Sequence, residues 1–309
     1  MKDQIKFAAK AVDKKTGLMK LENNAITSTN GRITIHIECE TGIDAVIKAD
    51  NAIGAANAIK GEMKAKKTGA SVMFLGGGAK VRAPIVEDSA FPNVDPGSDS
   101  KKIEGDFLGA MKTASLFAAD GDVRKFLNGV SLSNGKVQAS NGHVGVILDG
   151  IDGLDVIIPK ETVAILCDVG DAPESASSNA ASITFFYPWG WIKSVVIDSR
   201  FPEMEKLFRG ADDYFKGDIL ADAVSTIRKI KGSGAKVIID GAKVQSDDGE
   251  VVIESDGDFN RCSFSADLLD KVLSVATEIS LPDATKNDNA PGMFKGVNGL
   301  IGAIMPMRI

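Results

Sequence analysis

Apolar and polar positions alternate along three stretches of the chain, and a glycine interrupts each stretch. Residues 137–148 alternate on both sides of Ser140-Asn141-Gly142-His143, which predicts a strand, a tight turn and a second strand. Residues 25–36 and 251–258 follow the same pattern. The three turn glycines are Gly31, Gly142 and Gly257. Because they recur at intervals of roughly 110 residues, the pattern predicts one structural unit repeated three times.

The first copy is predicted to contain two amphipathic helices. Residues 3–14 have a helix-forming composition and place their apolar side chains on one face. A second helix is expected to begin at Asp50 and to continue to Met63, again with one apolar face. Lysines follow the exposed side of both predicted helices, and they include Lys6, Lys10, Lys14, Lys60 and Lys64.

The second copy is predicted to repeat the order of elements of the first. Residues 106–119 form a helix, and residues 129–148 form strands joined by an Asn-Gly hairpin turn. Residues 156–159 read as a short buried strand whose final proline begins the helix 160–167. Further strands are expected between residues 182 and 197.

The third copy is predicted to begin with a helix over residues 219–230, with basic residues near its C-terminus. Hairpin turns are expected at Asp240-Gly241 and at Asp248-Gly249. Ser265 is the expected N-cap of a second helix.

The ends of the three copies differ. The sequence Ser-x-Phe-Pro stands at residues 89–92 and again at 199–202, each time after an apolar strand. The third copy instead ends in the apolar residues 300–309. We expect this tail to be an edge strand that completes the third sheet, with Met305 and Met307 as adaptable contacts for a peptide partner.

Composition and charge are those of a soluble globular protein. Charged residues make up 25% of the 309 residues, hydrophobic residues make up 44%, and the net charge is −6. A negative net charge argues against a protein that coats nucleic acid with positive charge, but it permits a basic surface on one side. Three widely spaced cysteines predict buried free thiols in a reducing compartment. No signal peptide or membrane span is expected, so the predicted location is the cytoplasm.

Catalytic chemistry is poorly represented in the sequence. The chain has two histidines, and it lacks the nucleophile elbow, the phosphate loop and the zinc-binding helix of common enzymes. The segment 231–236 is glycine-rich but reads as an ordinary helix-to-strand loop. We therefore expect no catalytic residues, no metal and no cofactor. A three-domain enzyme with unrecognised catalytic groups stays an open alternative.

The lysine rows have two interpretations. Each row alone is typical of the solvated face of an amphipathic helix. Several such helices that point the same way would instead form a basic surface that binds phosphates without reading sequence.

Five segments give the chain a resemblance to a known family. They are 122–130 (DVRKFLNGV), 139–143 (ASNGH), 156–159 (VIIP), 198–202 (DSRFP) and 305–309 (MPMRI). With these residues the chain resembles the bacterial sliding clamps, the beta subunits of DNA polymerase III. The likeness covers the whole length and is strongest in the middle third and at the end.

The resemblance implies an α+β fold of three DNA-clamp domains, each with two helices packed on an antiparallel sheet. The domains would span residues 1–98, 99–211 and 212–309. Two chains would join head to tail into a closed ring around double-stranded DNA. Such a homodimer is a non-catalytic processivity factor that tethers the DNA polymerase and binds clamp-loader subunits. A clamp-like scaffold that binds partners without encircling DNA is a further alternative.

The resemblance also implies a surface between domains 2 and 3 that binds short peptides containing Leu and Phe. Its residues would be Leu127, Ser140, Gly142, His143, Val144, Gly145, Ala303, Met305, Pro306, Met307, Arg308 and Ile309. The family usually has Arg-Leu where this chain has Val144-Gly145, and Arg209 stands where a proline is expected. These departures bear on partner specificity.

Two further sets of residues follow from the expected ring. The DNA-facing residues would be Lys6, Lys10, Lys14, Lys60, Lys64, Lys112, Arg228 and Lys229. The dimer contacts would join an edge strand near 81–86 to the first helix of domain 3, through Val81, Ile85, Ile227 and Ile230. The chain is short for a cellular clamp, which favours a phage or another mobile element as its source.

Overall fold

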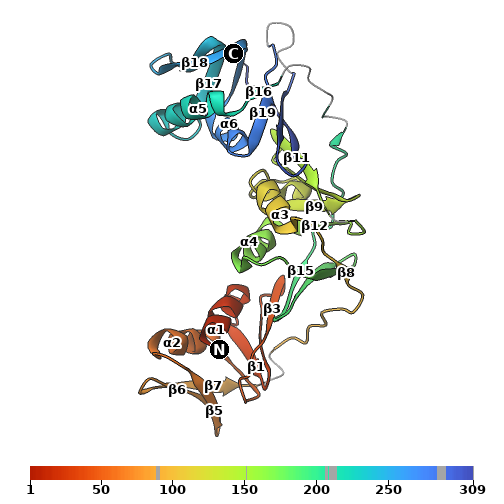
Figure 1. Cartoon of the computed structure of the whole chain (residues 1–309). Helices are drawn as coiled ribbons and strands as arrows, with labels where there is room; N and C mark the ends of the chain where they lie inside the picture. Colours follow the sequence, from red (N-terminus) through yellow and green to blue (C-terminus); the bar gives the residue numbers. More distant parts are fainter. Residues whose placement is uncertain (88–90, 151, 206–207, 209–213, 284–289, 309) are drawn as a thin grey trace. The chain divides into compact units, whose positions relative to one another are not determined.

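The computed structural model describes every residue except 88–90, 151, 206–207, 209–213, 284–289 and 309 (Figure 1). The chain separates into two compact units. Unit 1 contains residues 1–104 and 168–196, and unit 2 contains residues 105–167 and 197–309. The division into three clamp domains stays a prediction.

Unit 1 is built on an eleven-stranded sheet with the order β5-β6-β7-β4-β1-β2-β3-β15-β14-β13-β8. Its first strands are β1 (Leu18–Glu22), β2 (Ala25–Thr29), β3 (Ile33–Glu38), β4 (Ala45–Lys48), β5 (Lys64–Thr68), β6 (Ser71–Gly76) and β7 (Ala79–Val86). The others are β8 (Lys101–Lys102), β13 (Ser175–Ser178), β14 (Ser182–Tyr187) and β15 (Gly190–Val195). Its helices are α1 (Lys2–Ala8), the 3₁₀ turn η1 (Ala9–Ala11) and α2 (Ala49–Ala58).

Unit 2 contains an eight-stranded sheet with the order β12-β9-β10-β11-β21-β20-β19-β16 and a separate hairpin, β17-β18. The first strands are β9 (Gly129–Ser133), β10 (Lys136–Ser140), β11 (Val144–Asp149), β12 (Val156–Pro159) and β16 (Phe215–Lys216). The others are β17 (Lys236–Ser246), β18 (Val252–Ser265), β19 (Ala276–Ser280), β20 (Gly292–Gly296) and β21 (Ile301–Ile304). The helical segments are α3 (Phe107–Ser115), η3 (Lys125–Asn128), α4 (Lys160–Val169), α5 (Asp218–Lys231) and α6 (Ala266–Leu273).

Local sequence signals explain several of these elements. The Asp106 carboxylate caps α3 by accepting a hydrogen bond from the Gly109 N–H at 3.0 Å. Asn134 and Gly135 both have positive φ angles, 51° and 69°, as the predicted turn between β9 and β10 requires. The mixed α and β character and the antiparallel pairing of the described strands are confirmed.

The predicted triple turn is confirmed twice and wrong once. The turns at Gly31 and Gly142 have the same hydrogen bonds. In each turn a hydroxyl, that of Thr29 or Ser140, donates to the carbonyl four residues later. Gly257, in contrast, lies inside strand β18, where the pairing with β17 shifts register between Glu254 and Phe259. A related Asn-centred turn occurs instead at Asn179, whose side chain accepts hydrogen bonds from two following N–H groups.

Both predicted helices of the first copy end earlier than expected. After η1 the backbone of Val12 becomes extended, and Asp13 organises a turn that contains Lys14. Helix α2 ends at Ala58, so Lys60 lies in the following loop and Lys64 lies on β5. The helical placement of these three lysines was therefore wrong.

Two predictions about the third copy also change. Asp240-Gly241 lies within β17 at a shift in register rather than in a hairpin turn, whereas Asp248-Gly249 does lie between β17 and β18. The tail does not supply an edge strand, because β21 pairs with β11 on one side and with β20 on the other.

The first Ser-x-Phe-Pro sequence begins at residues 89–90, outside the described part of the chain.

The cysteines are free, as predicted, but only Cys262 is buried, and burial raises the pKa of its thiol to about 12. Cys39 and Cys167 are partly exposed, which corrects the expectation of three buried thiols. Within the described chain, none of the helices combines the length and the apolar character needed to cross a bilayer.

Candidate functional site

Strand pairing brings the Gly142 turn beside the end of the chain. Gly145 of β11 lies opposite Ala303 of β21, and Val144 lies opposite Ile304. The pairing continues past the strands, because the Met305 N–H donates a hydrogen bond to the His143 carbonyl at 2.8 Å. Two segments about 160 residues apart therefore form one continuous surface of unit 2.

The tail then extends to the β17-β18 hairpin. The Met307 N–H donates to the Ser263 carbonyl at 2.8 Å, and the Ser263 hydroxyl donates back to the Met307 carbonyl at 2.7 Å. The Lys236 ammonium donates to the Arg308 carbonyl. Met305 and Met307 keep 43% and 42% of their surface exposed, so the tail is fixed by its backbone and presents its side chains. Pro306 lies between them, and Ile309 is outside the described residues.

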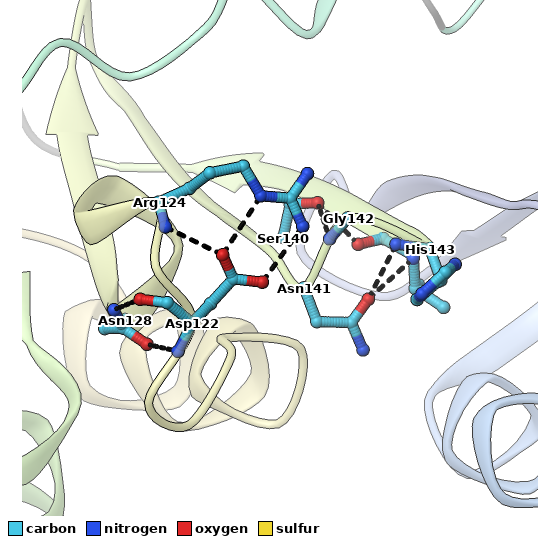
Figure 2. A network of polar contacts seen from close by, with 8 residues as sticks. Asp122, Arg124, Asn128, Ser140, Asn141, Gly142 and His143 are labelled. Carbon is cyan, nitrogen blue, oxygen red and sulfur yellow. Dashed lines mark hydrogen bonds and ion pairs between the residues drawn. The ribbon is translucent and has the colours of Figure 1, made fainter.

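Figure 2 shows how the turn is held. The Asn141 side-chain oxygen accepts hydrogen bonds from the His143 N–H at 2.9 Å and from the Val144 N–H at 2.8 Å. The Ser140 hydroxyl accepts from the Gly142 N–H at 3.0 Å and donates to the Val144 carbonyl at 2.8 Å. The His143 side chain is exposed on this rigid loop. The turn therefore presents His143 at small entropic cost.

An ion pair borders the same turn (Figure 2). Asp122 accepts hydrogen bonds from the Arg124 guanidinium at 3.0 and 2.9 Å and from the Arg124 N–H at 2.8 Å. The Asp122 N–H donates a hydrogen bond to the Asn128 side-chain oxygen at 2.8 Å, and the Asn128 side-chain amide donates to the Asp122 carbonyl at 2.7 Å. A Cβ added to Gly142 would lie only 2.6 Å from an Arg124 nitrogen. The guanidinium therefore lies directly against the turn.

Arg124 dominates the electrostatics of Asp122. Hydrogen bonds from the Arg124 side chain, then from its N–H, lower the pKa of the Asp122 carboxyl to about 2, and His143 contributes a smaller effect in the same direction. The carboxylate is ionised at neutral pH, and it raises the pKa of Arg124 in turn. Although both residues belong to the segment 122–130, sequence reasoning assigned neither to the site.

Buried apolar side chains support this surface from below. Leu127 and Ala303 are 2% and 8% exposed, so these two predicted residues support the surface rather than present themselves to a partner. Met204, which was not predicted, is 2% exposed and lies against Gly145, where an added Cβ would be 3.1 Å from the Met204 methyl carbon. The absence of a side chain at Gly145 thus makes room for Met204.

The predicted DNA-facing residues differ in their surroundings. Lys6 on α1, Lys112 on α3 and Lys229 on α5 are exposed. Lys10 forms an ion pair with Asp168, and Arg228 forms ion pairs with two carboxylates of α6 at 2.8 and 2.7 Å.

The helices as a group carry no excess of positive charge. The six described α-helices contain eight basic and eight acidic side chains. The helices are therefore not basic overall, and a basic face formed by several of them stays a prediction.

The four residues predicted at the dimer contact differ in burial and in strand pairing. Ile227 is fully buried and belongs to the core of α5, whereas Ile230 is 61% exposed. Strand β7 is not a simple edge, because Ile85 pairs with Ile47 of β4. Residues 79–84, which include Val81, pair only with β6 among the described strands.

No group of three His, Cys, Asp or Glu side chains suited to a metal ion occurs among the described residues.

The chain was compared with known proteins. No family model and no curated protein sequence matches it. Crystal structures of bacterial DNA polymerase III beta subunits do match, and each match covers 100% of this chain and 97% of the other. The Thermotoga maritima beta subunit is 17% identical with a TM-score of 0.80, and that of Streptococcus pyogenes is 16% identical with a TM-score of 0.78. The Helicobacter pylori beta clamp, bound to a DNA ligase peptide, is 11% identical with a TM-score of 0.81. Over its whole length, this chain has the fold of the bacterial sliding clamps.

Proposed function

We propose that the chain is a DNA sliding clamp, a non-catalytic processivity factor for a DNA polymerase. The observation that carries the proposal is the fold likeness, which extends over 100% of this chain and 97% of each clamp chain. Because a fold alone does not specify a function, the surface formed by the Gly142 turn and the tail has to support the likeness.

The proposed assembly is a ring of two chains, each divided into clamp domains at residues 1–98, 99–211 and 212–309. Domain 1 of one chain meets domain 3 of the other. Two observations support this arrangement. Residues 79–84 of β7 have one side without a strand partner among the described residues, and Ile230 is exposed on α5. An open strand edge and an exposed apolar side chain are both suited to a subunit contact.

The proposed mechanism is topological. A closed ring leaves duplex DNA only at an end or by opening, so retention needs no tight contact with phosphates. This mechanism needs only a few phosphate contacts, and a small number of such contacts permits sliding and changes little with salt. Exposed lysines such as Lys6, Lys112 and Lys229 supply the few sequence-independent contacts.

The surface formed by the Gly142 turn and the tail is the proposed docking site for the polymerase and the clamp loader. Exposed Met305 and Met307 offer polarisable contacts to Leu and Phe side chains of a short peptide. His143 and Arg124 offer polar contacts at its border. A polymerase held in this way stays at a high local concentration near the primer end.

The experiment uses a duplex anchored to beads at one end, onto which a ring can thread through the free end. The free end is then blocked with a bulky protein cap, and the beads are washed in roughly 1 M salt, where ionic contacts are screened within about 3 Å. A sliding clamp resists this wash and is released when a nuclease cuts the duplex. Loss of the protein in the wash from capped and uncapped DNA alike would contradict the proposal.

The second candidate function is a partner-binding scaffold that does not encircle DNA. The equal numbers of basic and acidic side chains on the helices favour it. The same capped duplex separates the two candidates. A scaffold binds the Leu- and Phe-containing peptide but is never retained, and the double change Lys6→Glu and Lys112→Glu leaves its background DNA signal unaltered.

A further inference from the structure

Strands β5, β6 and β7 form one end of the sheet of unit 1 and have two unlike faces. On one face Val72, Phe74 and Ala83 are fully buried, on the side where α2 contacts β7. The register of the three strands brings other side chains together on the opposite face, because successive residues of a strand alternate between faces. Two rows on that face are Lys64-Leu75-Lys80 and Lys66-Met73-Arg82. We call these six residues the basic sheet face.

The four cations of the basic sheet face are exposed and poorly neutralised. Lys64 has one acidic neighbour, Glu62, at 3.8 Å, and both side chains are at least three-quarters exposed. Arg82 donates a hydrogen bond to the Ser71 hydroxyl at 2.9 Å, and no ion pair joins it to a described residue. In a chain with a net charge of −6, this face concentrates charge of the opposite sign. Such a patch attracts an anionic partner.

The arrangement of the apolar residues narrows the kind of partner. Met73 and Leu75 are half-buried on the central strand, and the cations lie on the strands to either side. Because neighbouring strands are about 4.8 Å apart, the two lines of cations are separated by about 10 Å. An α-helix with its side chains is about 10–12 Å across, so a helix lying over β6 would place its two flanks above the two lines of cations.

An acidic amphipathic helix lying along β6 would match both the positive charge of this face and its apolar central strand. Its apolar stripe covers Met73 and Leu75, and carboxylates on its two flanks reach the cations. Duplex DNA fits less well, because phosphates placed over Met73 and Leu75 would lose water without gaining a hydrogen-bond donor. We propose that the basic sheet face docks an acidic amphipathic helix of a partner protein. This site is separate from the surface formed by the tail and goes beyond the proposed clamp function.

Fluorescence polarisation of a labelled synthetic peptide tests the proposal. The probe is a helical peptide with a Leu stripe and Glu on both flanks, and a scrambled peptide of the same composition is the reference. The full chain should prefer the amphipathic peptide, and its affinity should fall with salt. The double change Lys66→Glu and Arg82→Glu should weaken binding about tenfold or more, since charge pairs on both flanks become repulsive.

A matched control variant makes a charge change of the same size at another place on the surface. Lys14 and Lys15 are exposed in the turn after η1, so Lys14→Glu with Lys15→Glu alters the net charge equally and should leave peptide binding as in the parent. The single change Met73→Gln should weaken binding of the amphipathic peptide through its apolar stripe. Circular dichroism of every variant checks that the sheet is intact.

Four results of the binding measurements would overturn the proposal. They are no binding of the amphipathic peptide to the parent, equal binding of the scrambled peptide, equal losses in the test and control variants, and binding of a short DNA duplex in place of the peptide. Self-association of the chain that the test variant abolishes, without peptide binding, would identify a second copy as the occupant and would also overturn it.

Discussion

Replacing Gly142 by alanine isolates what the turn contributes to the docking surface. Gly142 has a φ of 88°, in the left-handed region that alanine adopts only under strain. Strain of this kind costs about 1–3 kcal/mol. In addition, the new Cβ would lie 2.6 Å from an Arg124 nitrogen, so the guanidinium must shift away from the turn.

Gly31 provides a matched control in unit 1. It occupies the equivalent position of the related turn with a φ of 81°, but an added Cβ there would meet no atom within 4 Å. Gly31→Ala and Gly142→Ala should therefore carry the same backbone strain, about 1–3 kcal/mol. Only Gly142→Ala should displace an arginine from the proposed peptide surface.

The assay combines two measurements on each variant. Hydrogen exchange measures the local stability of each turn, and fluorescence polarisation measures the affinity for a labelled peptide containing Leu and Phe. We expect similar local destabilisation in both variants and weaker peptide binding, by about fivefold or more, in Gly142→Ala alone. The reasoning is refuted if Gly142→Ala binds the peptide like the parent, or if Gly31→Ala loses as much affinity.

Three more predictions address charge, thiol chemistry and the tail. Because the pKa of Asp122 is lowered to about 2, its stabilising contribution is present above the ordinary value and is lost as pH falls toward 2. The stability difference between the parent and Asp122→Asn should therefore be constant above about pH 5 and disappear near pH 2 in acid titrations; a difference that grows on acidification would contradict this. Cys262 should resist alkylation at pH 8 in the folded chain while the partly exposed Cys39 reacts, as read by mass spectrometry; equal labelling would be inconsistent with the burial. Met305→Ala with Met307→Ala should abolish peptide binding while the main-chain N–H of position 307 keeps its bond to Ser263, and unchanged affinity would exclude the tail as the docking site.

Features specified by neighbouring residues could be predicted from the sequence. The Asn134-Gly135 turn follows from the positive φ angles that these residues tolerate. Strand β12 ends at Pro159, and α4 begins at the next residue. The Gly142 turn was also predictable, because Ser140 and Asn141 supply its hydrogen bonds locally.

Features that depend on distant residues could not be predicted. The contact of Arg124 with Gly142, and that of Met204 with Gly145, join segments whose proximity only the folded sheet creates. The lysines after α2 were misplaced because alternating lysines also fit a helical spacing over a few residues, while Gly61, with a φ of 71°, separates the helix from β5.

The same limit applies to the third copy of the turn. Residues 251–258 alternate like the other two stretches, yet β18 begins at Val252 and continues past Gly257, with a shift in its register to β17 between Glu254 and Phe259. Alternation predicts a strand but does not say where the strand ends. Gly257 carries no positive φ angle, whereas Gly31 and Gly142 do, and the sequence alone does not distinguish these conformations.

The mass and shape of the particle in solution test the central claim most directly. Light scattering combined with small-angle X-ray scattering should give twice the chain mass of 32.5 kDa and the profile of a hollow ring at micromolar concentration. A particle that stays at the mass of one chain under these conditions, or a compact dimer without a central hole, would contradict the account.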